Sequence, residues 1–293
     1  MYSGNNEKKS EKYISQGILL GIKLTYEPMM GVDVSRDDQI KDACSKREEL
    51  VKGIELIPNI LRLRTIRKED LERFRSQKLV IEFFKTEFGQ TLIEWIHHDP
   101  YEINKIYNII EKTLLALRLL QPGNVFLSHI FSYTNDFVFK ELLNYRSPPK
   151  FYTYYSLDIN QKGTLKDIFN NLLSVEFEKD IPFRISCDRF NSSYYDVLSE
   201  DRLIDLCIAF EALFLKGEYK QSDLGMGQVI GLACSMLLGE KKKKRKKISN
   251  VLREGFSLRN RVVHGRNFKR SQISEILPDF EDYLRKSILR LIP

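Results

Sequence analysis

Apolar residues recur at spacings of three and four along the last third of the chain, which is the period of helices with one buried face. Ser199 is a favourable N-cap for the first of these helices. Glu200 and Asp201 follow it and place negative charge at the positive end of the helix dipole. The pattern ends near Gly217. The predicted buried stripe comprises Leu203, Leu206, Cys207, Phe210, Leu213 and Phe214.

Two further helices are predicted downstream. Residues 224–239 are apolar on all sides and rich in glycine, so we expect a helix buried between neighbours that approach it closely. The next pattern runs from about Lys246 to Val263, and Gly265 closes it. Each segment is long enough to span the core of a small helical domain.

The last predicted helix covers 272–291 and follows a loop at 266–271. Pro278 lies inside its apolar stripe, which predicts either a kink or a later start. Four helices with short connections favour a compact antiparallel bundle over residues 196–293.

The N-terminal part has a mixed pattern. Residues 61–66 begin with apolar and polar alternation, as in a half-buried strand, and 67–77 then predict a short helix. Residues 125–133 and 151–157 are rich in strand-forming side chains. Together they predict a mixed α/β domain over residues 1–195, and an α+β protein as a whole.

One amphipathic helix is predicted within that N-terminal domain. Asp99 and Pro100 supply an N-cap and a first-turn proline, and residues 121–123, Gln-Pro-Gly, end the helix. The apolar stripe between these signals comprises Ile103, Ile106, Tyr107, Ile110, Leu114 and Leu117.

Composition is that of an ordinary globular protein, with 42% hydrophobic and 30% charged residues among 293. A membrane-spanning helix needs about 18 consecutive apolar residues, and no segment approaches that length. The first residues also lack the apolar core of a signal peptide. The four cysteines are scattered, and we expect Cys207 and Cys234 to be buried thiols. These features predict a reduced, cytoplasmic protein that does not enter the membrane.

Positive charge is concentrated in the C-terminal third. Residues 199–293 contain 19 lysines and arginines against 12 acidic residues, which accounts for the whole net charge of +7. A polyanionic partner such as RNA is one interpretation. The alternative is a solvated run of cations at 241–247, Lys-Lys-Lys-Lys-Arg-Lys-Lys.

The sequence offers few histidines for chemistry. His97, His98 and His129 have no accompanying cluster of cysteines or carboxylates, so we predict no metal site there. There is also no phosphate-binding glycine loop. We therefore expect neither a metal nor another cofactor.

His264, with Arg259 and Asn260, is the strongest candidate site. Asn260 and His264 are four residues apart and share a helix face, whereas Arg259 points about 140° away from His264. The arginine is long enough to bring its guanidinium back towards the imidazole. Histidine can accept a proton from a ribose 2′-hydroxyl or donate one to a leaving 5′-oxygen, and arginine can bind the phosphate between them. The alternative is that these residues only cap the helix.

Cleavage of RNA by its own 2′-hydroxyl uses both a base and an acid, but one chain offers a single histidine here. A two-fold dimer with its axis near this helix would place two copies of His264 and of Arg259 around one cleft. We therefore predict a homodimer, on grounds of chemical need.

The phrase Leu-Arg-Asn-Arg-Val-Val-His-Gly at 258–265, together with the segment 189–215, resembles the HEPN superfamily and its ApeA-like group from bacterial defence systems. The likeness covers roughly residues 189–293. It implies a four-helix HEPN bundle that acts as a dimeric, metal-independent endoribonuclease in antiviral defence or as a toxin. Arg259 and His264 match the catalytic pair, Asn260 the polar position after the arginine, and Glu211 an acidic position of the first helix, for which we favour a structural role.

Several cations could gather RNA around this motif through phosphate contacts. We expect the N-terminal domain to respond to a regulatory protein or ligand. Two other functions stay open, namely a non-catalytic HEPN nucleotide- or RNA-binding or dimerisation module and a regulatory subunit of a larger complex. The predicted RNA-binding residues are Lys241, Lys242, Lys243, Lys244, Arg245, Lys246, Lys247, Arg261, Arg266, Lys269 and Arg270.

Overall fold

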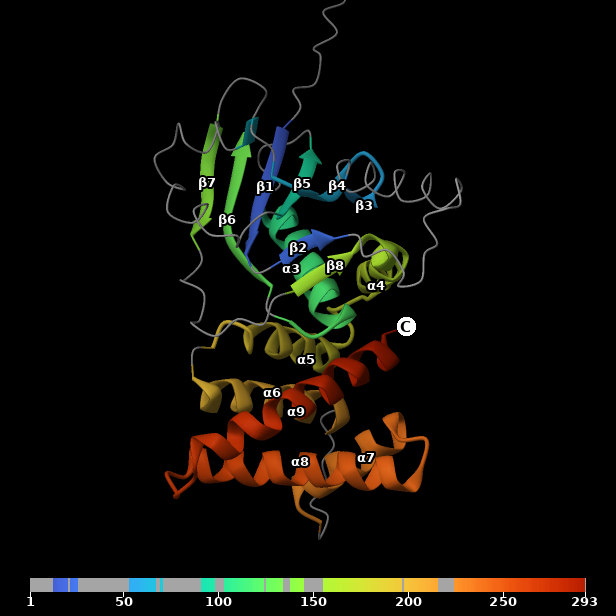
Figure 1. Cartoon of the computed structure of the whole chain (residues 1–293), viewed down its shortest axis with the longest axis vertical. Coiled ribbons are helices and arrows are strands. Elements are labelled where there is room, and N and C mark those ends of the chain that lie inside the picture. Colours follow the sequence, from blue (N-terminus) through green and yellow to red (C-terminus); the bar gives the residue numbers. More distant parts are fainter. Residues whose placement is uncertain are drawn as a thin grey trace, which may run out of the picture. The chain divides into compact units, whose positions relative to one another are not determined.

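The chain folds as an α+β protein whose described residues form two compact units (Figure 1). The computed structural model describes residues 13–20, 22–25, 53–66, 69–70, 91–97, 103–123, 125–133, 138–144, 155–196, 198–215 and 224–292. Unit 1 takes its residues from 1–111, 127–147 and 154–163. Unit 2 takes its residues from 112–126, 148–153 and 164–293.

Unit 1 is built on β-structure. Its larger sheet has, within the described part, six strands in the order β3-β4-β5-β1-β6-β7, and the pairs β3/β4, β4/β5, β5/β1 and β6/β7 are antiparallel. A separate parallel pair joins β2 to β8. The strands are β1 (Tyr13–Leu20), β2 (Ile22–Thr25), β3 (Ile54–Ile57), β4 (Leu61–Thr65), β5 (Thr91–His97), β6 (Phe126–Tyr133), β7 (Val138–Asn144) and β8 (Tyr155–Asp158).

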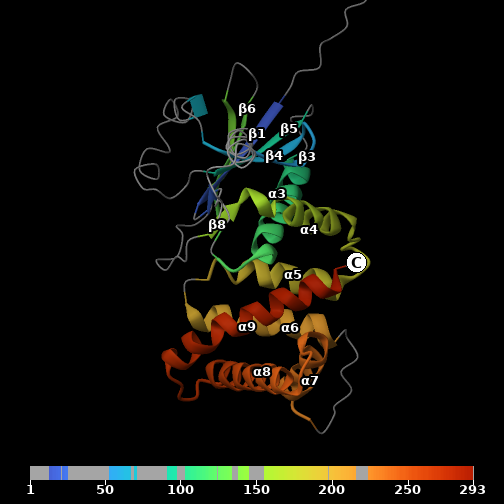
Figure 2. The ribbon, with the colours of Figure 1, turned by 45° about the vertical axis from the view of Figure 1, so that its right-hand side comes forward.

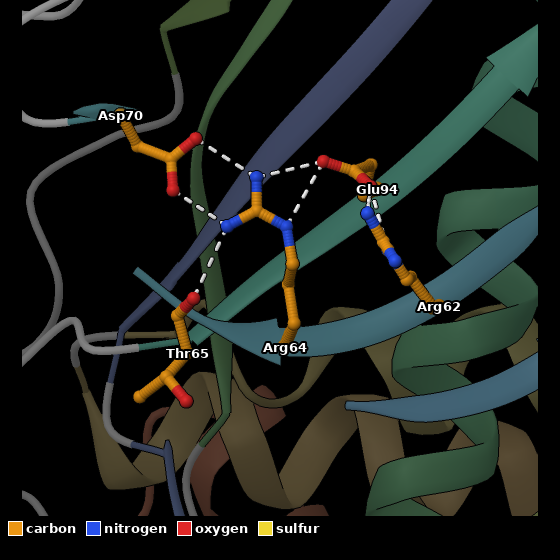
Figure 3. A network of polar contacts seen from close by, with 5 residues as sticks. All are labelled: Arg62, Arg64, Thr65, Asp70 and Glu94. Carbon is orange, nitrogen blue, oxygen red and sulfur yellow. Dashed lines mark hydrogen bonds and ion pairs between the residues drawn. The ribbon is translucent and has the colours of Figure 1, made fainter. Parts of the chain in front are cut away.

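Strand β4 confirms the strand predicted at 61–66 but is buried more completely than its alternation suggests. Leu61 and Leu63 are buried as expected, and Arg64 is only 3% exposed. Figure 3 shows the cause: the Arg64 guanidinium donates to Asp70 and to Glu94, and Glu94 also accepts from Arg62 Nε at 2.6 Å. Burial alone would lower the pKa of Arg64, but the hydrogen bonds and charges of Asp70 and Glu94 outweigh it and raise that pKa.

Helix α3 (Ile103–Leu120) follows the predicted amphipathic pattern. Ile110, Leu114 and Leu117 are buried, and the helix ends before Gly123, whose φ of 142° suits glycine alone. The predicted strands at 125–133 and 151–157 correspond to β6 and, from Tyr155, to β8. Asp99, Pro100, residues 151–154 and the predicted helix at 67–77, apart from the helical pair 69–70, lie outside the described residues.

Unit 2 is helical. Helix α7 lies beside α8, and α6 and α9 pack on one another and on this pair, in both views (Figures 1 and 2). Helix α5 packs on α6 and α9 as well. The helices are α4 (Lys162–Ser174, preceded by the short 3-10 turn Ile159–Gln161), α5 (Ile181–Ser192), α6 (Ser199–Leu215), α7 (Met226–Leu238), α8 (Lys242–Val263) and α9 (Arg270–Leu291).

The predicted domain boundary at 195/196 falls inside unit 2. Helix α5 and the turn after it belong to the helical unit because Phe183 and Phe190 are buried there and Tyr194 donates to Glu281 of α9 at 2.6 Å. Helices α4 and α5, before residue 195, have buried apolar residues of their own and were not predicted as helices. Unit 2 therefore starts before α5, at residue 164 in α4, and it also includes residues 112–126.

Three predicted helix starts differ from the structure. Ser199 is the first residue of α6 and not its N-cap. Its hydroxyl donates a hydrogen bond to the Glu200 carboxylate at 2.9 Å, and the first backbone hydrogen bond of the helix runs from Arg202 N to Leu198 O. Helix α8 begins at Lys242, about one turn earlier than predicted. The repulsion among its first lysines disfavours a helix there, but the buried Ile248 and Leu252 stabilise it by packing. Helix α9 begins at Arg270 and continues through Pro278, which excludes a later start.

Helix α7 is not enclosed on all sides. Its glycines do permit the predicted close approach: a Cβ at Gly227 would lie 2.7 Å from Phe256 Cβ, and one at Gly231 would lie 3.1 Å from Ser249 O. On the opposite face, however, Leu232 and Met236 are 55% and 65% exposed. Cys207 and Cys234 are buried thiols, as predicted. None of the helices in the described part combines the length and the apolar character that a membrane crossing requires.

The environment of Asp196, just before α6, predicts that the stability of unit 2 depends on pH. Burial, followed by the nearby Asp205 and Asp201, raises its pKa from 3.8 to about 6. The folded chain therefore binds this proton more tightly than the unfolded chain, so its contribution to stability is fully present below about pH 4 and is lost as the pH rises through about 6.

We expect Asp196→Asn to stabilise the protein at pH 7.5 by about 1–2 kcal/mol and to have little effect at pH 4. Urea unfolding at the two pH values measures this. Asp167→Asn, at an exposed position of α4, is the control and should change neither value. An equal gain from Asp196→Asn at both pH values would show that the charge is not the cause.

Candidate functional site

The candidate site lies on the C-terminal half of α8. Four polar residues, Arg253, Ser257, Asn260 and His264, follow one another at spacings of four, three and four and so share one face of the helix. The rest of the helix surface supplies Leu252, Gly255 and Phe256 to the core. Packing of that face against α7 and α9 fixes the direction in which the polar stripe points.

Arg259 lies off this stripe and faces Glu211 of α6. Its Nη2 is 3.7 Å from Glu211 Oε1, and its Nη1 donates to Asn260 Oδ1 at 3.3 Å. The side chains of both ion-pair partners are about three-quarters buried. Arg259 Nε and Glu211 Oε1 are nevertheless buried without a hydrogen-bond partner within the part of the chain that the structure describes. Arg259 and Glu211 are therefore held together by charge and not by a hydrogen bond.

Burial dominates the electrostatics around this pair. Desolvation raises the pKa of Glu211, and the positive charge of Arg259 offsets only part of that rise. The neighbouring Cys207 is fully buried, and burial raises its thiol pKa well above the ordinary value. Cys207 is thus held as an unreactive thiol, and Glu211 is best explained as the residue that orients Arg259.

His264 stands at the end of α8, in the C-cap position, and its side chain is exposed. Its backbone N donates to Asn260 O at 3.1 Å, and the left-handed Gly265, with a φ of 62°, ends the helix as predicted. We expected the Arg259 guanidinium to reach back towards the imidazole. Instead it is held by Glu211, and among the described residues no hydrogen bond or ion pair joins it to His264. The 140° angular separation accounts for this.

An open pocket of about 560 Å³ lies between the start of α7 and this half of α8. Arg259 and Asn260 line it, whereas His264 does not. Four arginines line this space, and the described lining contains no carboxylate. The lining residues are Gly225, Met226, Gly227, Gln228, Arg253, Phe256, Ser257, Arg259, Asn260, Arg261 and Arg266.

The predicted RNA-binding cations occupy three different places. Lys241–Lys247 form an exposed run at the start of α8, about 30 Å from His264 at about 1.5 Å per residue. Two members of the run have structural partners: Arg245 Nε donates to Gly239 O at 2.7 Å, and Lys247 pairs with Asp279 at 2.8 Å. The other members of the run are exposed, so phosphate binding by them stays a prediction.

The remaining cations lie beyond the end of α8 or in its last turn. Arg261 and Arg266 line the pocket, and Lys269 is the exposed N-cap residue of α9. Arg270 is engaged elsewhere, since its Nε donates to Glu200 Oε1 at 2.6 Å. The structure thus gathers Arg261 and Arg266 with Arg259 and separates Arg270 from them.

Sequence reasoning missed Arg253 and the first turn of α7. The spacing of Arg253, Ser257, Asn260 and His264 along one helix is a signal that could have revealed the arginine. The participation of α7 depends on tertiary packing and has no comparable signal. His97 ends β5 and His129 lies in β6, but their side chains, like all of His98, lie outside what the structure describes. Within the described part, no group of three histidines, cysteines or carboxylates could hold a metal ion.

No protein-family model matches the chain, and neither a curated protein nor a solved structure matches it significantly.

Proposed function

We propose that the chain is an endoribonuclease of HEPN type that cleaves RNA at a site composed of residues from two subunits. The observation that supports this most is the concentration of Arg259, Asn260 and further arginines around an open pocket whose α8 stripe continues to the exposed His264. The resemblance of 258–265 to the HEPN motif assigns the same arginine and histidine to catalysis.

The proposed reaction needs only groups that the RNA and the protein supply. His264 of one subunit accepts the proton of a 2′-hydroxyl, and the 2′-oxygen forms a bond to the adjacent phosphorus. The bond from phosphorus to the 5′-oxygen breaks, and the His264 copy from the other subunit protonates that oxygen. Arg259 stabilises the charge on the non-bridging oxygens. The products are a 2′,3′-cyclic phosphate and a 5′-hydroxyl.

Unit 1 has a regulatory role in this proposal. In its described part it presents a buried ion network around Arg64 and Glu94, and that network satisfies its own charges. We propose that this sheet unit senses a trigger or selects the RNA, and that the protein acts in antiviral defence or as a toxin.

A non-catalytic RNA- or nucleotide-binding module is the second candidate. Its supporting observation is that the arginines line the pocket whereas His264 does not, and that Glu211 holds Arg259. Incubation of labelled RNA with the purified protein in EDTA separates the two. Binding without cleavage would favour the second candidate, and cyclic-phosphate ends would favour the first.

The composite site requires a dimer, and α7 offers an apolar surface for it. Leu232 and Met236 are four residues apart and are the most exposed large apolar side chains in the described part of the chain. We expect light scattering to give twice the chain mass of 34.5 kDa, and Leu232→Glu combined with Met236→Glu to give the single mass.

Ile181 and Ile185 provide the matched control, since they are also exposed and four apart, on α5. Ile181→Glu combined with Ile185→Glu should leave the dimer intact. A wild-type protein that is monomeric at micromolar concentration would contradict the predicted dimer. If both double variants became monomeric, the proposed role of α7 in the dimer interface would be wrong.

A further inference from the structure

The pocket beside Arg259 has the chemistry of a phosphate subsite. Arg253, Arg261 and Arg266 are exposed and have no carboxylate partner in the described part of the chain, and Arg259 also lines the pocket. A volume of about 560 Å³ lies in the range of pockets that hold small organic ligands. Guanidinium groups bind phosphate oxygens through paired, charge-assisted hydrogen bonds.

The start of α7 adds backbone donors to the same pocket. Gly225 is its N-cap and supplies no side-chain hydrogen bond, while Gln228 N and Val229 N already bond to Gly225 O. The N–H groups of Met226 and Gly227 are the remaining donors of this first turn. Gly227 packs directly on Phe256, which positions this turn against α8. The helix terminus thus supports the arginines in attracting an anion.

The pocket and His264 are separate points on one helix stripe. Arg253 precedes His264 by 11 residues, which is about 16 Å along the axis. Arg259 and Asn260 lie between these two ends. A phosphate held near Arg253 is therefore a different phosphate from the one next to His264, and a single strand that runs along α8 can supply both.

We propose that Arg253 and the first turn of α7 bind a backbone phosphate of the RNA that lies further along the strand than the linkage next to the cut. This inference rests on the proposed nuclease function and names the part of the substrate that the pocket recognises. The protein then requires an RNA that is long enough to place a charged linkage in the pocket, and a dinucleotide is a poor substrate.

The test uses short oligonucleotides with one ribose. All other sugars carry a 2′-O-methyl group, so that only one linkage can be cut, and one of the other phosphates at a time is replaced by a neutral methylphosphonate. We expect one such replacement to lower kcat/KM of the wild type by about 10–100-fold, as loss of a charge-assisted contact does. We expect Arg253→Gln to lower kcat/KM on the charged oligonucleotide similarly and to be insensitive to that replacement.

Arg290→Gln is the matched control, since Arg290 is an exposed arginine of α9 outside the pocket. It should retain the wild-type sensitivity to the neutral linkage. If Arg253→Gln and wild type respond equally to every replacement, the subsite is wrong even though cleavage is real. If the wild type cuts nothing, fluorescence anisotropy of the same oligonucleotides with wild type and Arg253→Gln still tests the pocket.

A free nucleotide is the other source of a phosphate group. Adenosine monophosphate should compete only weakly with the labelled oligonucleotide in that binding assay. Competition at the same concentration as the oligonucleotide, lost in Arg253→Gln, would overturn the assignment to the RNA backbone.

Discussion

The His264→Ala variant is expected to cleave RNA about 100- to 10,000-fold more slowly than the wild type, in a buffer that contains EDTA. Loss of a positioned general acid or base has an effect of this size, and both copies of the histidine are lost together in a homodimer. Gel analysis of an end-labelled RNA, with identification of the terminal cyclic phosphate, is the measurement. Because the His264 side chain is exposed, the free energy of unfolding should be unaffected.

Arg259→Ala should lose activity by about 100- to 1,000-fold, since one stabilising donor of an anionic transition state contributes that much. It also leaves Glu211 without its cationic neighbour, so the double variant Arg259→Ala with Glu211→Gln checks for indirect effects. Arg290→Ala serves as the surface control. Full activity in either His264→Ala or Arg259→Ala, with the dimer intact, would refute the assignment of catalysis to this pair.

Arg118→Met is expected to destabilise unit 2 by about 3–5 kcal/mol. Arg118 is fully buried at the end of α3, and its guanidinium donates to Val125 O at 2.7 Å and to Asn191 O at 3.0 Å. The same group lies 4.5 Å from the Tyr194 ring centre and 4.9 Å from that of Tyr195. Its removal leaves buried carbonyl groups without donors and removes the cation from both rings.

Urea unfolding followed by the circular dichroism of the helices measures this loss. Arg118→Lys keeps a charge, but its single nitrogen replaces the separate guanidinium nitrogens that bond to Val125 O and Asn191 O, so an intermediate loss is expected. Arg184→Met is the matched control, because Arg184 pairs with Glu178 at 3.3 Å on the surface and should change stability by less than about 1 kcal/mol. If Arg118→Met and Arg184→Met lowered the free energy of unfolding equally, the buried contacts of Arg118 would stabilise the protein no more than a surface ion pair.

The segments whose patterns were strong could be predicted from the sequence. The stripes of α3, α6 and α9 have a clear helical period, and α3 and α8 end at the local signals Gln-Pro-Gly and Gly265. Other segments were missed because their local preferences are weak or misleading. Strand β7, Val-Phe-Lys-Glu-Leu-Leu-Asn, is rich in residues that favour helices, and its strand form comes from pairing with β6.

The candidate site shows the same division. The order of residues along α8 was enough to determine that Asn260 and His264 share a face, because a helix repeats every 3.6 residues. Where Arg259 points, and which residues meet it, depends on packing between helices that are distant in sequence. Glu211, Arg253 and the start of α7 come together only through that packing, and the polar network of Arg64 with Glu94 spans 30 residues for the same reason. Local spacing fixes angles within one helix, whereas only the burial of several apolar faces against one another brings separate elements into a site.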